Sequence, residues 1–294
     1  MPNIRKLKAG YFRAEEEVGT LVDILETILA KPINQRNFTI SSYPFRIENF
    51  AKQNVAGENV YEGDFIKVRM ENLPVIASKD EGVEDIGLSD DEGIGEETAF
   101  LYAPRPKILI LQRNRAGTSY TRAADYFNHF GGGTNIIGFS VMMNRNALQR
   151  LRRARAFRSI SFSIAPTCSA EELQGSGASL DHAISAMDGL GGEKMSLNVS
   201  LKPHGEGSLI KQEVKSAITK LLAFRDRSRS NVSSIKLRAE EDDGVSVIDF
   251  IKDRLIFSDD VTIDREERHL SYTTRRNFLR QAWLSRAFQN QITR

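Results

Sequence analysis

A run of arginines between positions 145 and 158 is the strongest signal for chemistry in this sequence. The run contains no acidic residue, and its basic members are Arg145, Arg150, Arg152, Arg153, Arg155 and Arg158. The guanidinium group is a planar fork that donates paired hydrogen bonds to phosphate oxygens and is more weakly hydrated than an ammonium group. The run therefore predicts binding to a polyanion, and we expect the phosphate backbone of double-stranded DNA to be the partner.

An amphipathic helix over residues 145–154 must present these arginines, because Leu148, Leu151 and Ala154 supply an apolar side at helical spacing. A strand over 158–166 follows, in which apolar residues alternate with serines. Small hydroxyl groups allow a phosphate backbone to approach closely, so we add Ser161 to the predicted nucleic-acid-binding residues.

A terminal helix over 272–289 carries a second basic group. Arg275, Arg276 and Arg280 are predicted to extend the nucleic-acid-binding surface. The same helix places Phe278 and Trp283 on adjoining faces, and we expect these two aromatic residues to form part of a homodimer interface.

The segment from residue 80 to residue 97 has nine acidic residues and no basic one, which leaves a net charge of +11 on the rest of the chain. Its glycines predict a mobile loop over 78–98. We expect this loop to be regulatory, because its carboxylates would compete with phosphates for the same arginines. The regulatory residues would be Asp85, Asp90, Asp91 and Glu92. Alternatively, the arginines serve only to pair with this loop or with a partner protein.

Hydrophobic periodicity predicts an α/β protein of the α+β type, with amphipathic helices packed on mixed or antiparallel strands. Helices are expected over 18–30, 119–130, 145–154, 208–224 and 272–289. Strands are expected over 6–13, 38–40, 45–50, 64–70, 100–103, 107–112, 136–142, 158–166, 195–202, 233–239, 245–249 and 261–264. The glycine run at 131–133 marks a boundary between two sheet-containing lobes, residues 1–133 and 134–294.

No motif in the sequence defines an enzyme or a metal site. Glu213-Val214-Lys215 matches half of a nuclease motif, but it falls within a helical pattern and is more simply a surface ion pair. The single cysteine, Cys168, and four dispersed histidines indicate neither a disulfide nor a zinc cluster. No stretch approaches the ~20 apolar residues of a membrane-spanning helix. We therefore expect a soluble, cytoplasmic binding protein without a catalytic residue, metal or cofactor.

With these pieces in order, the chain resembles the family of the phage lambda Rex exclusion system's A protein. The resemblance rests on five segments, which are 8–12 before the helix at 21–30, 89–95 before the strand at 100–102, 118–131, 197–203, and 235–239 before the acidic turn at 242–244. It implies a dimeric, DNA-binding sensor of a prophage or bacterial phage-exclusion system that causes abortive infection. It also implies a small membrane protein as the partner.

Together these observations predict an antiviral defence protein that binds DNA without sequence preference and acts with a membrane partner. Two other classes remain open. One is a Mg²⁺-dependent nuclease or nucleotide-acting effector, which loss of cleavage on Glu213→Ala would reveal. The other is a pure protein-interaction module, which would capture its partner without any affinity for nucleic acid.

Overall fold

The computed structural model of the chain describes residues 3–16, 20–133, 136–164, 182, 185, 189, 195–202, 207–227, 232, 234–242, 244–263 and 269–292. It forms two compact units, unit 1 with residues Met1–Val141 and Ile256–Arg294, and unit 2 with residues Met142–Leu255. Both units contain antiparallel sheets with helices packed on them, which confirms the α+β class. The predicted element ends at Val18, Pro166, Ser233 and Asp264 lie outside the described residues, as do Cys168, His204 and the side chain of Leu148.

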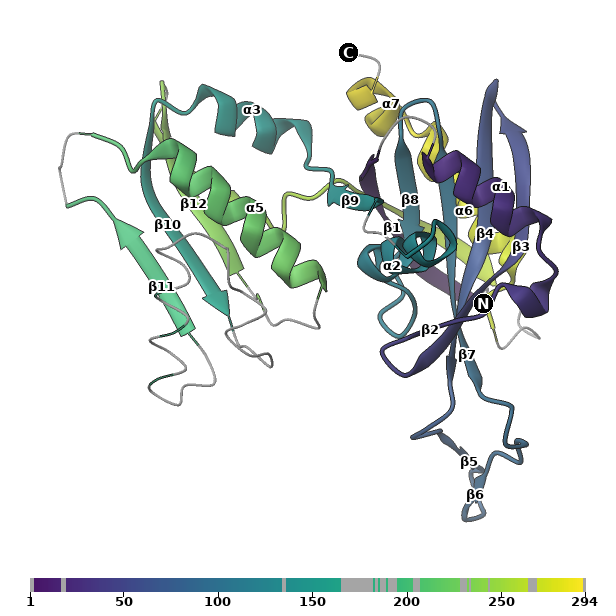
Figure 1. Cartoon of the computed structure of the whole chain (residues 1–294). Coiled ribbons are helices and arrows are strands. Elements are labelled where there is room, and N and C mark those ends of the chain that lie inside the picture. Colours follow the sequence, from purple (N-terminus) through teal and green to yellow (C-terminus); the bar gives the residue numbers. More distant parts are fainter. Residues whose placement is uncertain are drawn as a thin grey trace. The chain divides into compact units, whose positions relative to one another are not determined.

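Unit 1 contains an eight-stranded antiparallel sheet in the order β14-β1-β8-β7-β4-β3-β2, with β9 paired to β1 (Figure 1). Its strands are β1 (Asn3–Glu15), β2 (Phe38–Ile40), β3 (Tyr43–Val55), β4 (Glu58–Arg69), β7 (Ile94–Ala103), β8 (Ile108–Gln112), β9 (Gly138–Val141) and β14 (Ile256–Ile263). The strands β3 and β4 form one long hairpin, although the sequence predicted two short, separate strands. Ala56 and Gly57 make its turn with φ angles of 52° and 85°, a left-handed conformation that Ala-Gly does not signal as strongly as Asn-Gly.

Helices cover both faces of this sheet because strand residues alternate in direction. On one face, α1 (Thr20–Ala30) and α2 (Tyr120–Phe130), with the short 3-10 helix η1 (Ile33–Gln35) after α1, enclose an aromatic core that includes Phe65 and Phe100. On the other face lies α6 (Tyr272–Leu284), followed by α7 (Arg286–Ile292). Along β4, Tyr61 and Phe65 therefore enter the α1 and α2 core, whereas Glu62 and Asp64 face α6.

The C-terminal segment Ile256–Arg294 differs from the prediction, because it belongs to unit 1 rather than to the second lobe. The edge strand β14 pairs with β1 from Asn3↔Ile263 to Gly10↔Ile256. The hydroxyl of Tyr11 donates to the carbonyl oxygen of Ala282 at 2.8 Å. The predicted single helix over 272–289 is also broken at Ser285, whose backbone is extended. The break turns Phe288 onto the ring of Tyr11, with centroids 4.4 Å apart.

Unit 2 has a four-stranded antiparallel sheet in the order β11-β10-β12-β13. The strands are β10 (Ala156–Ile164), β11 (Met195–Ser200), β12 (Ser234–Glu241) and β13 (Gly244–Asp249). Two helices, α3 (Arg145–Arg153) and α5 (Lys211–Arg227), pack on one face of this sheet. Their core partners include Phe162 on β10 and Leu237 on β12.

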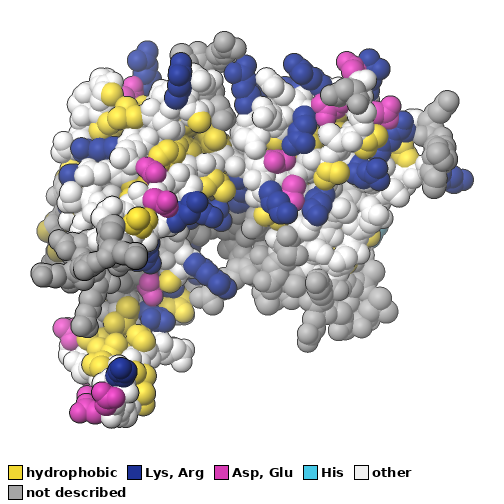
Figure 2. All heavy atoms as spheres, turned by 180° about the vertical axis from the view of Figure 1, so that it is seen from behind, with side chains coloured by type: hydrophobic (Ala, Val, Ile, Leu, Met, Phe, Trp, Pro, Cys, Tyr) yellow, Lys and Arg dark blue, Asp and Glu magenta, His cyan; other side chains and the backbone are white. Residues whose placement is uncertain are grey.

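Among the described residues, no helix covers the opposite face of the unit 2 sheet. We call this side the open face. Figure 1 is drawn with α5 in front of the sheet, so the view from behind in Figure 2 looks onto the open face, where basic and acidic side chains are interspersed. Half-exposed antiparallel sheets normally alternate apolar and polar residues, and β10 does so from Ser159 to Ile164.

The acidic segment is a projecting hairpin arm rather than a loop over 78–98. Two short strands, β5 (Val75–Ala77) and β6 (Val83–Asp85), pair at its end, and it extends from β4 and β7 (Figure 1). The prediction of a loop up to residue 98 was wrong, because β7 begins at Ile94 and pairs with β4. The apolar run from Ala99 to Ala103 fits a buried strand, but the acids before it concealed where the strand begins.

Candidate nucleic-acid interface

The predicted arginine helix exists as α3, and its ends have local causes. The side chain of Asn144 accepts a hydrogen bond from the Ala147 amide at 2.9 Å and so caps the first turn. Ala147 is buried and Leu151 is partly buried against the unit 2 core, which fixes the face that α3 turns inward. Arg145, Arg152 and Arg153 are exposed on the remaining surface of the helix.

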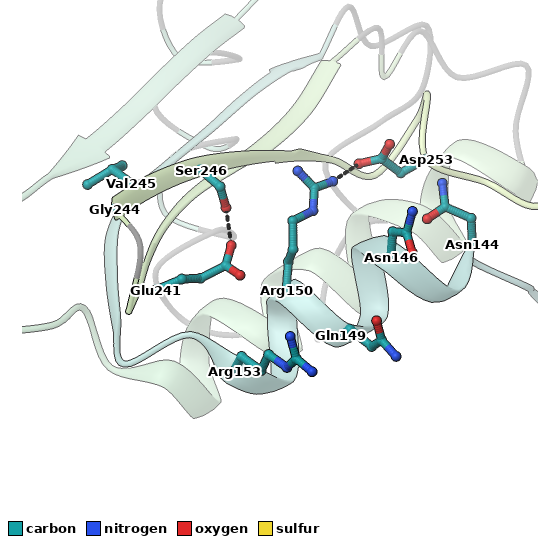
Figure 3. A pocket seen from close by; sticks show the side chains of 10 residues that line it. All are labelled: Asn144, Asn146, Gln149, Arg150, Arg153, Glu241, Gly244, Val245, Ser246 and Asp253. Carbon is teal, nitrogen blue, oxygen red and sulfur yellow. Dashed lines mark hydrogen bonds and ion pairs between the residues drawn. The ribbon is translucent and has the colours of Figure 1, made fainter.

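Arg150 has a structural role, although the sequence placed it with the phosphate contacts. Its guanidinium donates to the carbonyl oxygen of Val247 at 3.1 Å and forms an ion pair with Asp253 at 3.0 Å (Figure 3). The carboxylate of Asp253 also accepts from the Asp249 amide at 3.1 Å. Since β13 is an edge strand, these contacts occupy backbone groups that would otherwise be open to another strand.

Arg155 and Arg158 also have acidic partners within unit 2. Arg155 pairs with Asp242, and Arg158 pairs with Glu240 on β12. A bulge in the pairing of β10 with β12 falls at Arg158, between Phe157 and Ser159. These two cations are therefore partly neutralised, whereas no ion pair joins Arg145, Arg152 or Arg153 to another described residue.

Ser161 lies on the open face, on the other side of the sheet from α3. The sequence predicted that the helix and the serine-lined strand form one surface, and this was wrong, because the helix packs against the apolar side of that strand. The register places Ser161 between Asn198 on β11 and Lys236 on β12. Arg238 follows beside Ser159 in the next row.

Lys236 and Arg238 were not among the predicted site residues. Both are exposed on β12, and neither has an acidic partner among the described residues. Their signal was present in the strict alternation of Ile235, Leu237 and Ala239 with polar residues, which predicts that both basic side chains leave the sheet on its polar side. The sequence did not reveal that Ser161 would be their neighbour.

A cleft of about 610 Å³ lies between α3 and the β12–β13 hairpin (Figure 3). Its charged lining residues are of both signs, and they are Arg150, Arg153, Glu241 and Asp253. Glu241 accepts a hydrogen bond from Ser246, and Asp253 is bound to Arg150. Carboxylates inside the cleft disfavour a phosphate there, so an anion would meet the outer surface of α3 instead.

The basic residues of α6 are largely internal, so the structure removes Arg275 from the predicted interface. Its side chain is 2% exposed and lies between Asp64, at 2.5 Å, and Glu97, at 2.6 Å. Arg280 pairs with the buried Glu62 at 2.5 Å. Arg276 is partly exposed and lies over the ring of Tyr272. Alternation in β4 explains the arrangement, because it turns Glu62 and Asp64 toward this helix.

Burial has a clear effect on Asp64, whose side chain is completely inaccessible to solvent. Desolvation raises the pKa of Asp64 to about 6, while the hydrogen bond and charge of Arg275 act in the opposite direction. One of its two carboxylate oxygens, Oδ1, has no hydrogen-bond partner. The pair of Asp64 and Arg275 thus belongs to the interior of unit 1 and contributes to how α6 packs on the sheet.

The predicted dimer contacts are also internal. Phe278 is 1% exposed and Trp283 is 5% exposed within a single chain. Phe278 packs on the ring of Phe257, with centroids 5.3 Å apart, and Trp283 packs on Phe288 at 5.6 Å. The sequence showed an apolar helix face correctly but could not show that β14 and α7 of the same chain cover it.

The proposed regulatory acids Asp85, Asp90, Asp91 and Glu92 are all exposed on the hairpin arm. A hydrogen bond from the Ser89 amide to the carboxylate of Glu92 at 3.0 Å lowers the pKa of Glu92. The last two acids of the segment differ from these four, because Glu96 pairs with Arg69 and Glu97 with Arg275. Glu96 and Glu97 are therefore part of the sheet and not of the arm.

Within the described part of the chain, no group of three or more His, Cys, Asp or Glu side chains could hold a metal ion. Glu213 is exposed in the first turn of α5, with Val214 buried beside it. No described helix is long and apolar enough to cross a membrane.

The fold and its surface define a two-unit α+β protein whose second unit presents basic side chains that have no acidic partner among the described residues. The chain belongs to the family of unknown function DUF6731, whose model matches residues 9–285 and so includes parts of both units. A comparison with curated proteins finds no match.

Proposed function

We propose that this protein binds the phosphate backbone of double-stranded DNA through unit 2, with little sequence preference. The observation that carries the proposal is the set of exposed arginines on α3, Arg145, Arg152 and Arg153, which have no acidic partner among the described residues. Unit 2 has 18 Lys and Arg residues against 14 Asp and Glu, so its net charge is also favourable. Arginines held on a helix by a buried apolar side are suited to bidentate phosphate contacts.

The biological setting that we propose follows from the resemblance to the Rex exclusion family. In this proposal the protein is a cytoplasmic, homodimeric sensor in a prophage or bacterial phage-exclusion system, and a small membrane protein completes the response. The dimer would form through a surface other than Phe278 and Trp283, since both are buried within one chain.

Replacing Arg145, Arg152 and Arg153 together with alanine is expected to weaken DNA binding by at least about tenfold at low salt. Each phosphate contact contributes about 0.9 to the slope of log affinity against log salt, so the slope should become shallower by roughly 3. Fluorescence anisotropy with a labelled duplex across a salt series measures both quantities. Arg150 stays in place because its loss would disturb β13.

The matched control replaces Arg105, Arg113 and Arg115 with alanine, which removes the same charge from exposed positions of unit 1. This control should bind DNA as wild type does. An equal loss of affinity in both variants would show that net charge alone causes the effect. If wild type binds no DNA even at low salt, the proposed function is overturned, and the arginines of α3 would then be tested for a contact with a partner protein.

We further propose that the exposed carboxylates of the hairpin arm restrain DNA binding by competing with its phosphates. Changing Asp85, Asp90, Asp91 and Glu92 to their amides is expected to tighten DNA binding several-fold at low salt, with a smaller effect at high salt because exposed charges are screened. The same anisotropy titration measures it. Glu96 and Glu97 are left intact since they hold the sheet and α6. Unchanged affinity at low salt would show that the arm does not compete.

A further inference from the structure

The unit 2 sheet separates two groups of cations that form no ion pair with another described residue. Arg145, Arg152 and Arg153 lie on α3, whose inward residues pack in the core with Ile160 and Leu237. Lys236 and Arg238 point to the opposite side, because they alternate along β12 with residues of that core. The two groups therefore belong to surfaces on opposite sides of one four-stranded sheet.

The open face has the chemistry of a backbone-binding surface. Its central row places the amide of Asn198, the hydroxyl of Ser161 and the ammonium of Lys236 side by side on neighbouring strands, and Asp249 on β13 ends the row beside Lys236. The next row places Ser159 beside Arg238. Strands of a sheet are about 4.8 Å apart, so these short polar side chains offer closely spaced hydrogen bonds around two positive charges.

The charges on this face favour an anionic partner. Glu240 is paired with Arg158. Asp249, opposite Lys236 in the register, accepts hydrogen bonds from the amides of Ile251 and Lys252 at 3.1 Å but keeps its negative charge. The two cations Lys236 and Arg238 therefore outnumber this one carboxylate. Lys236 and Arg238 remain without acidic partners among the described residues. The four described strands present no aromatic side chain to this face, so stacked single-stranded bases are a poor fit and a duplex backbone is a better one.

From this geometry we infer that unit 2 bridges two DNA duplexes, one bound by α3 and one by the open face. The inference rests on the proposed function, since it needs α3 to bind DNA. A short duplex cannot reach both surfaces, because duplex DNA has a persistence length of about 150 base pairs and resists bending around the unit. Contact with both surfaces at once then requires two duplexes.

A capture experiment tests this with the full chain. One 16-base-pair duplex is fixed to beads, a second labelled duplex is added, and the label retained by the protein is measured at low salt. Wild type and the Arg105, Arg113, Arg115→Ala control should retain the label. The double variant Lys236→Ala, Arg238→Ala should retain less than about one tenth of the label. In anisotropy this variant should still bind one duplex through α3.

The outcomes separate the two proposals. If wild type binds no duplex in anisotropy, the proposed function fails and bridging fails with it. If wild type binds a duplex but captures no second one, DNA binding stands and bridging is overturned. A homodimer that binds one duplex per protomer through α3 would keep full capture in the double variant, and this result also overturns bridging by the open face. Thermal unfolding followed by circular dichroism verifies that each variant is folded.

Discussion

Arg275→Met is expected to lower the free energy of unfolding by about 3–5 kcal/mol, since it removes one partner of a buried ion pair. Arg275 is 2% exposed and Asp64 is inaccessible, so the carboxylate left behind could not regain its hydration. Glu97 would suffer less, because its side chain is 37% exposed. Denaturant unfolding followed by tryptophan fluorescence suits the measurement, since Trp283 is on the same helix.

The loss in Arg275→Met should depend on pH in a defined direction. The pKa of Asp64 is raised from 3.8 to about 6 in the folded chain. A proton on this group therefore favours the folded state, and the contribution is fully present below about 3.8 and is lost as the pH rises through 6. Without the opposing charge of Arg275, the pKa of Asp64 in the folded state rises further. The loss in free energy of unfolding relative to wild type should therefore become smaller as the pH falls from 7 to 5.

Two further variants show whether the charge is the cause. Arg276→Met removes a neighbouring, partly exposed arginine of α6 and is expected to cost less than about 1 kcal/mol. Combining Arg275→Met with Asp64→Leu removes both partners and should recover most of the lost stability. The loss of stability could instead be the same at pH 5 and pH 7 and remain after Asp64→Leu is added. That result would point to lost packing as the cause.

The sequence predicted the helices of this fold well where one face is apolar. The predicted helix over 119–130 corresponds to α2, and the one over 145–154 to α3, because both combine an apolar side with a capping residue, Ser119 or Asn144. The predicted strand over 158–166 corresponds to β10, since its alternation of apolar residues and serines is strict. These signals are local, so a single sequence contains them.

Pairing between distant segments could not be predicted in the same way. β14 joins β1 across more than 240 residues, and nothing in the local pattern of either strand specifies the other. The same limit explains the errors at the site. The sequence does not show whether an arginine is exposed to solvent or paired with a carboxylate from a distant segment. Arg150 and Arg275, which form ion pairs, therefore could not be distinguished from the exposed Arg152. Lys236 became a candidate only when the register placed it beside Ser161.

The aromatic residues of α6 illustrate this limit and lead to a test with a similarly large effect. Phe278→Ala is expected to lower the free energy of unfolding by about 3–5 kcal/mol, because Phe278 is only 1% exposed and its loss opens a cavity beside Phe257. The oligomeric state, measured by light scattering, should not change. Leu284→Ala is the matched control, since Leu284 is 51% exposed on the same helix and its loss should cost less than about 0.5 kcal/mol. If Phe278→Ala instead shifts the protein toward monomer with little loss of stability, this residue contacts a second chain, and the helix opens in solution to form a dimer.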